Sequence, residues 1–201
     1  LLFFLSNFEG ISQIKLNQWN DNYYNKYNYQ TFQNLELIHQ EIDENNVDFK
    51  LLNAAIFYST NIQRVKFGRN AFKHSTALEK AAQGHSIDMA NHNFFSHKSK
   101  LIGKESLSDR LTLVGIQNSY SGENIALRSL KKSYWEISQA LLDQWMNSPG
   151  HRANILNENY NFLGCGSYSY THESYHKKYV KSTQNFSSIS GNTYKNKNYY
   201  N

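Results

Sequence analysis

The sequence predicts an α+β fold in which helices pack on a mostly antiparallel central sheet. Two segments, 49–66 and 76–92, place apolar residues at intervals of three and four, which is typical of helices buried along one face. Two later segments, 162–171 and 178–187, are rich in aromatic and β-branched residues and flank a polar turn, so they predict a β-hairpin. Helices that precede strands in this way indicate an α+β architecture.

The first two helices are predicted from their apolar stripes. The stripe of the first consists of Leu52, Ala55, Ile56 and Ile62, and Gly68 ends the run. The stripe of the second consists of Leu78, Ala82, His85, Met89 and His92, at steps of four, three, four and three. Since His85 shares its stripe with apolar residues, we expect a core histidine there, although His85-x2-Asp88-x3-His92 also has the spacing of a metal site.

Three further helices are predicted from the residues that would begin them. Ser106 with Asp109 resembles a capping box at the start of LSDRLTLV, which Gly115 would end. Ser133 with Glu136 repeats this pattern before YWEISQALLDQWMN. Ser148 followed by Pro149 places a capping serine and a first-turn proline before a short helix or turn.

The two ends of the chain differ from this middle part. Residues 17–34 are polar and aromatic without a clean period, and only 35–44, with Leu35, Ile38 and Ile42, suggests a short helix. We therefore divide the chain into an Asn/Tyr-rich N-terminal segment (1–46), one folded domain (47–188) and a polar, basic tail (189–201).

Composition excludes several classes of protein. A single cysteine, Cys165, permits neither an internal disulfide nor a zinc site built from several cysteines, and we expect it to be a small buried apolar residue in a strand. The net charge of +5 is spread over scattered basic residues, so we expect no specific nucleic-acid binding. No apolar run reaches the roughly 18 residues that span a bilayer. The opening LLFFLS is shorter than the apolar core of an export signal, and without an initial Met we expect a longer precursor.

Three short clusters place an ionisable side chain beside turn-forming residues: FFSH (94–97), SGENIA (121–126) and WMNSPGHRANIL (145–156). His97 follows the second helix, and Glu123 lies between Gly122 and Asn124, which indicates a turn that Asn124 would order. His151 is the third residue of the helix that Ser148 begins. The positive end of that helix dipole disfavours a protonated imidazole there, and neutral imidazole is the form that binds a metal or accepts a proton.

The order and spacing of these clusters resemble one known family. The run from HSIDMANHNFFSH through GENIA to QWMNSPGHRANIL and LGCG, with KSTQNFS at the end, is similar to the CAP superfamily: cysteine-rich secretory proteins, antigen 5 and pathogenesis-related 1 proteins, and their disulfide-free relatives with an SPGHR motif. The resemblance covers about residues 48–187. It implies an α-β-α sandwich with a surface cleft lined by His97, Glu123 and His151.

The resemblance also carries expectations about chemistry. Many members line the cleft with two His and two Glu, but Ser148 stands here where the second Glu would be, three residues after Trp145. The three remaining residues are the candidate catalytic groups and, weakly, the candidate ligands of a divalent metal such as zinc. Because one carboxylate is missing, we favour a secreted, extracellular binding or effector module, with a lipid or sterol as the implied ligand, over an enzyme.

Two alternatives remain open from the sequence. A metal-assisted hydrolase would use His97 and His151 as ligands and Glu123 as ligand or general base. An adhesive or structural domain would make its contacts through the Tyr- and Asn-rich N-terminal segment. Among other conspicuous residues, we expect Trp135 and Trp145 in the core and Arg152 in a salt bridge.

Overall fold

The computed structural model describes residues 19–131, 133–172 and 177–191. Its helices, in chain order, are η1 (Asp21–Asn25), α1 (Tyr29–Phe32), η2 (Glu36–His39), α2 (Phe49–Lys66), α3 (Thr76–Asn91), α4 (Leu107–Leu113), α5 (Tyr134–Met146) and α6 (Pro149–Leu156), where η marks a 3-10 helix. Its strands are β1 (Lys73–His74), β2 (Ser121–Ser129), β3 (Phe162–His172) and β4 (Lys177–Ser187). Every helix and strand predicted between residues 47 and 188 is present.

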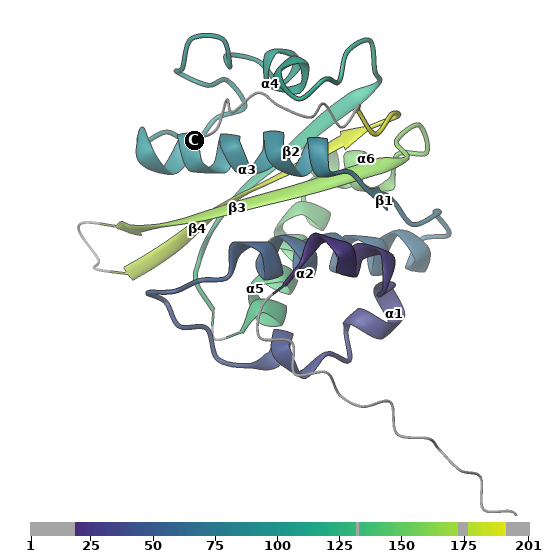
Figure 1. Cartoon of the computed structure of the whole chain (residues 1–201), viewed down its shortest axis with the longest axis vertical. Coiled ribbons are helices and arrows are strands. Elements are labelled where there is room, and N and C mark those ends of the chain that lie inside the picture. Colours follow the sequence, from purple (N-terminus) through teal and green to yellow (C-terminus); the bar gives the residue numbers. More distant parts are fainter. Residues whose placement is uncertain (1–18, 132, 173–176, 192–201) are drawn as a thin grey trace, which may run out of the picture.

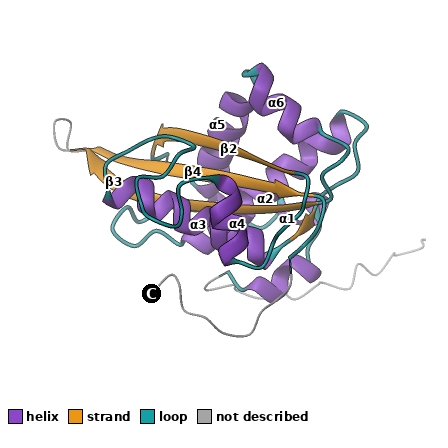
Figure 2. Ribbon diagram, turned by 90° about the horizontal axis from the view of Figure 1, so that it is seen from above, coloured by secondary structure: helices purple, strands orange, loops and turns teal. Residues whose placement is uncertain are grey.

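The four strands form one sheet in the order β1-β3-β4-β2. β4 pairs antiparallel with both β3 and β2, and the short β1 runs parallel to β3. In Figure 1, α3 and α4 lie above the sheet while α2 and α5 lie below it, and Figure 2 shows α4 stacked outside α3. The architecture is therefore an α+β sandwich of helices on both faces of a mostly antiparallel sheet, as the sequence predicted.

The helix starts confirm the capping chemistry expected from the sequence. Ser106 and Asp109 form a reciprocal capping box at α4, and the Ser133 hydroxyl accepts from the Glu136 amide at α5. At α6, Pro149 occupies the first turn, but the Ser148 side chain makes no capping hydrogen bond. These local interactions fix where α4 and α5 begin and hence where their side chains point.

Two glycines let α3 lie directly on β3. A methyl group added to Gly164 would overlap the backbone of Leu78 and Glu79, and one added to Gly166 would overlap Ala82 and Gln83. Cys165, between them, is buried and faces the main core on the other side of the sheet. The LGCG motif thus brings a helix and a strand into backbone contact.

The core confirms most of the expected buried residues. Trp145 is fully buried and its indole N–H donates to the Ile125 carbonyl (3.1 Å), whereas Trp135 is only half-buried. His85 is fully buried, as its place on the apolar stripe predicted, but His92 is exposed at the end of α3. Arg152 forms no ion pair within the described residues and lies instead over the Phe67 ring, 4.8 Å from its centre.

The N-terminal segment corrects an expectation. The lack of a clean period in residues 17–34 predicts no continuous buried face, yet in the described part of this segment Trp19 and Phe32 are buried in the main core with Ile38 and Ile42. The apolar period did not reveal this burial because Trp19 and Phe32 lie on short, irregular turns and not on one long helix. Their rings are held by an edge-to-face contact, with centroids 5.3 Å apart. The predicted helix within 35–44 is a 3-10 helix, η2. Whether residues 47–188 fold alone stays a prediction, and most of the tail lies outside the described residues.

No helix in the described ranges combines the length and the apolar character needed to cross a membrane.

Candidate functional site

Glu123 lies in a strand, which corrects the predicted turn. It is the third residue of β2 and pairs in register with Asn185 of β4. The Gly-Glu-Asn sequence resembles a turn because these residues are common in turns, but cross-strand pairing and burial decided the structure. Successive side chains of a strand alternate between faces. Glu123 therefore points toward α3 and α4, while Asn124 points toward α6.

Glu123 is a buried residue (8% exposed), and both of its carboxylate oxygens are engaged. His97 Nδ1 donates to Oε1 at 2.9 Å, and Arg110 Nη2 donates to Oε2 at 2.7 Å. The Asn185 amide, oriented so that its oxygen accepts from the Ala82 amide, also donates to Oε2 at 3.1 Å. Burial alone would raise the pKa of Glu123, but the hydrogen bonds from His97 and Arg110 and the nearby charges outweigh it and lower that pKa.

Arg110 and His85 complete the surroundings of this carboxylate. Arg110 is fully buried on α4 and also donates to the carbonyls of Lys104 (3.0 Å) and His97 (3.2 Å). His85 Nε2 is 3.0 Å from the Ser96 carbonyl and 3.9 Å from Glu123 Oε1. Burial lowers the pKa of His85 to about 4, so its imidazole is neutral at pH 7 and Arg110 balances the charge of Glu123.

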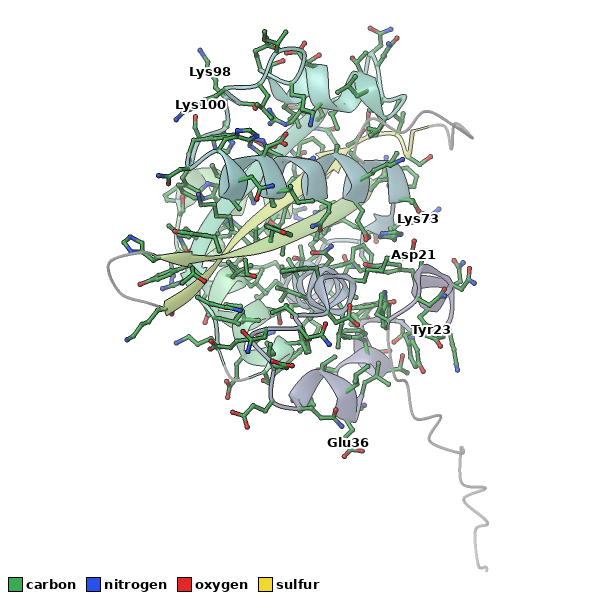
Figure 3. The ribbon with its side chains drawn as sticks, turned by 60° about the vertical axis from the view of Figure 1, so that its left-hand side comes forward. Asp21, Tyr23, Glu36, Lys73, Lys98 and Lys100 are labelled. Carbon is green, nitrogen blue, oxygen red and sulfur yellow. The ribbon has the colours of Figure 1, made fainter. Side chains whose placement is uncertain are left out.

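His97 is the exposed member of the site. Its side chain is 54% exposed, in the loop between α3 and α4. Figure 3 shows Lys98 and Lys100 of this loop pointing away from the body of the protein. The buried Lys181 of β4 fastens the start of the loop by donating to the carbonyls of Met89 (2.8 Å) and Phe94 (2.9 Å). Since Nδ1 donates to Glu123, the neutral ring presents Nε2 as an acceptor.

His151 lies on α6 and contacts β2 through its backbone. Its carbonyl accepts from the Asn124 side chain (3.1 Å), and Asn124 also accepts from Asn154 (2.9 Å) and donates to Gln184 (3.1 Å). Asn124 therefore ties β2 to α6 and to β4, and it does not order a turn. Burial, and then the nearby charge of His97, lower the pKa of His151. Its Nδ1 is buried without a hydrogen-bond partner among the described residues.

The geometry does not fit a bound metal. Within the described ranges, no three His, Cys, Asp or Glu side chains are arranged to hold one. A cation at Glu123 would have to displace His97 from Oε1 or lie beside the Arg110 guanidinium at Oε2. Ser148 supplies no second carboxylate. The sequence missed Arg110 because a single arginine in a short amphipathic helix usually faces solvent, and only its burial reveals the ion pair.

Residues 57–186, well over half of the chain, match the family CAP, described as the cysteine-rich secretory protein family. The chain belongs to the CAP superfamily. It shares 39% identity over 107 residues with two Bacillus subtilis proteins: YkwD, uncharacterised, and YlbC, an uncharacterised membrane protein. That alignment covers 53% of this chain but only 38% of YkwD and 29% of YlbC, so the chain spans about a third of these curated relatives.

Solved CAP structures agree with the fold. An extracellular protein of Bacillus anthracis that contains an SCP domain is 33% identical, with a TM-score of 0.56 over 70% of this chain and 41% of its own. The CAP domain of enterococcal PrgA is 11% identical, with a TM-score of 0.53 over 92% of this chain and 86% of its own, and shows similarity of fold alone. The CAP sandwich described above is therefore shared across distant bacterial proteins.

Proposed function

We propose that this CAP protein is an exported binding module whose cleft, formed by His97, Glu123 and His151, holds an organic ligand by hydrogen bonds. One observation carries the proposal: both oxygens of Glu123 are engaged, by His97 and by Arg110. A carboxylate held in this way positions an imidazole and is poorly placed to accept a substrate proton or bind a metal. The extracellular SCP-domain protein of B. anthracis supports export of this chain.

The free nitrogens of the two imidazoles suggest the ligand. His97 offers Nε2 toward solvent, and the buried Nδ1 of His151 lacks a partner among the described residues. An unsatisfied buried polar atom costs about 1–3 kcal/mol, which a ligand would recover by bonding to it. A hydroxyl or protonated carboxyl group matches these nitrogens. A sterol or fatty acid carries such a group at one end, and so we propose a lipid of this kind.

Direct titration tests this function. We expect a fluorescent sterol or fatty-acid analogue to bind the full chain saturably, and His97→Ala and His151→Ala to weaken binding at least tenfold. His92→Ala, an exposed imidazole outside the site, is the matched control and should bind like wild type. Equal affinities for all four proteins would contradict the proposal, as would the absence of saturable binding of either probe.

Hydrolysis is the second candidate, because a carboxylate-oriented imidazole such as His97 is the arrangement of a general base. Ester and peptide hydrolysis should then depend on His97, and His97→Gln should abolish it. Calorimetric titration of zinc into chelator-treated protein separates the metal-assisted version. A zinc affinity that falls at least tenfold in both His97→Ala and His151→Ala would favour the hydrolase over the binding module.

A further inference from the structure

A polar cavity of about 230 Å³ lies away from the cleft, where the end of α2 faces the segment that joins α6 to β3. Its polar lining includes Arg64, Arg69, Asn70, Glu158, Tyr160 and Asn161. None of the cavity's lining residues belongs to the His97–Glu123–His151 cleft.

Arg64 is a buried cation that contacts only neutral groups within the described residues: three backbone carbonyls and the Phe72 ring. Arg64 as a whole is only 2% exposed. Nε donates to the Asn70 carbonyl (2.6 Å), and Nη1 donates to the carbonyls of Ile155 (2.6 Å) and Asn157 (2.9 Å). In the described part of the chain no acid pairs with Arg64, and its Nη2 has no hydrogen-bond partner. Two N–H donors of a buried cation are thus left over beside a cavity.

Arg69 adds a second positive charge to the same cavity. It pairs with Glu158, but the two side chains are 39% and 67% exposed, and exposed pairs of this kind contribute little free energy. Its Nε is buried without a partner among the described residues. Burial, and then the charge of Arg69, lower the pKa of Arg64 to about 10, so the two guanidinium groups repel each other. Two cations therefore face a single carboxylate.

We propose that this cavity binds an oxoanion, that is a carboxylate, phosphate or sulfate group, through Arg64 Nη2 and the Arg69 guanidinium. Guanidinium groups present paired N–H donors that match such anions. The anion balances the second positive charge, which Glu158 alone leaves uncompensated, and the cavity volume admits a group of this size. Glu158 pairs with Arg69 and so competes with the anion for this guanidinium. Because the pair is exposed, the anion can displace the Glu158 carboxylate from Arg69.

Titration of the full chain with sodium sulfate, sodium phosphate and sodium acetate tests this site, with sodium chloride at matched ionic strength as reference. The chain has only five arginines, so the Nε–H resonances of Arg64 and Arg69 can be followed by NMR. We expect saturable shifts of both resonances with at least one oxoanion and none with chloride. Comparing the three salts distinguishes a tetrahedral anion from a carboxylate as the preferred group.

Charge variants sharpen the test. Arg69→Gln should weaken binding at least tenfold, and Glu158→Gln should strengthen it several-fold by removing the internal competitor. Arg128→Gln, an exposed arginine of β2 well away from the cavity, removes the same charge as a control and should titrate like wild type. Arg64 itself is left unchanged because its hydrogen bonds hold three backbone carbonyls. Shifts equal in chloride, or an Arg69→Gln variant with wild-type affinity, would overturn the proposal.

Discussion

At the scale of single residues, the centre of the candidate site is an ion pair between Glu123 and Arg110, with the imidazoles of His85 and His97 beside it. A buried ion pair is weak evidence of stability, but removing one partner leaves an uncompensated charge and typically costs about 3–5 kcal/mol. Here the pair also orients His97, since the other carboxylate oxygen accepts from that imidazole. The orientation of His97 therefore depends on Arg110, which is itself fully buried.

His85 makes the protein sensitive to acid. Its imidazole has a pKa of about 4 when folded and about 6.5 when unfolded, because burial penalises the charged form. Between pH 6.5 and 4, the His85 imidazole binds a proton in the unfolded chain but not in the folded chain. The stability is thus fully present above pH 6.5 and is lost as the pH falls toward 4. The whole loss from this residue is about 3 kcal/mol at 1.36 kcal/mol per pKa unit.

Urea denaturation at pH 7, 5.5 and 4.5 measures this effect. We expect His85→Gln, which retains an N–H donor for the Ser96 carbonyl, to lose less stability on acidification than wild type. His92→Gln, at an exposed position, should keep the wild-type dependence. Parallel pH curves for wild type and His85→Gln would show that the buried imidazole is not the source.

At the scale of elements, the contact of α3 with β3 is set by glycine. Gly166→Ala would drive its methyl group into the backbone of Ala82 and Gln83, and helix backbone cannot move aside as a flexible side chain can. We expect a loss of about 3 kcal/mol, at the upper end of typical overpacking costs, in thermal or urea denaturation.

Gly150→Ala provides the matched control for this change. Gly150 lies in the first turn of α6, and a methyl group there meets no atom within 4 Å. Its stability should stay the same or rise slightly, because alanine restricts the unfolded chain. Equal stabilities of the two variants would mean that α3 does not rest on β3 in solution as it does here.

At the scale of the whole molecule, residues 19–42 add an aromatic layer to the core below α2. Trp19, Phe32 and Tyr58 contact one another through their rings, and the Tyr58 hydroxyl donates to the Tyr27 carbonyl (3.0 Å). An adhesive domain would need the Tyr-rich N-terminal segment at the surface, but these contacts hold part of that segment against the core. They also place α2 between two layers, which explains why nearly all of its first three turns are buried.

Deletion of residues 1–46 tests the predicted domain boundary at Val47. We expect the shortened chain to be markedly less stable than the full chain in urea, because Phe57 and Tyr58 of α2 would lose their aromatic cover. Trp19→Ala should reproduce part of the loss, about 3–5 kcal/mol for a buried Trp. Unchanged stability of the deletion would establish 47–188 as a domain that folds without this segment.

The sequence by itself determined the helices from α2 to α6 and the β3–β4 hairpin, because apolar period and capping residues are local signals. The resemblance to the CAP superfamily came instead from motifs in a fixed order, from HSIDMANHNFFSH to LGCG. It also identified His97, Glu123 and His151 as candidate cleft residues. Only the tertiary structure decided that Glu123 lies in a strand, that Arg110 neutralises it, and that Trp19 and Phe32 join the core. Each of these features depends on contacts between residues distant in sequence, such as Arg110 with Glu123 or Trp19 with Tyr58. The free energy gained by burying such contacts overrides the local preferences of the residues for a turn or a helix. Contacts of this kind also produce no periodic pattern in the sequence.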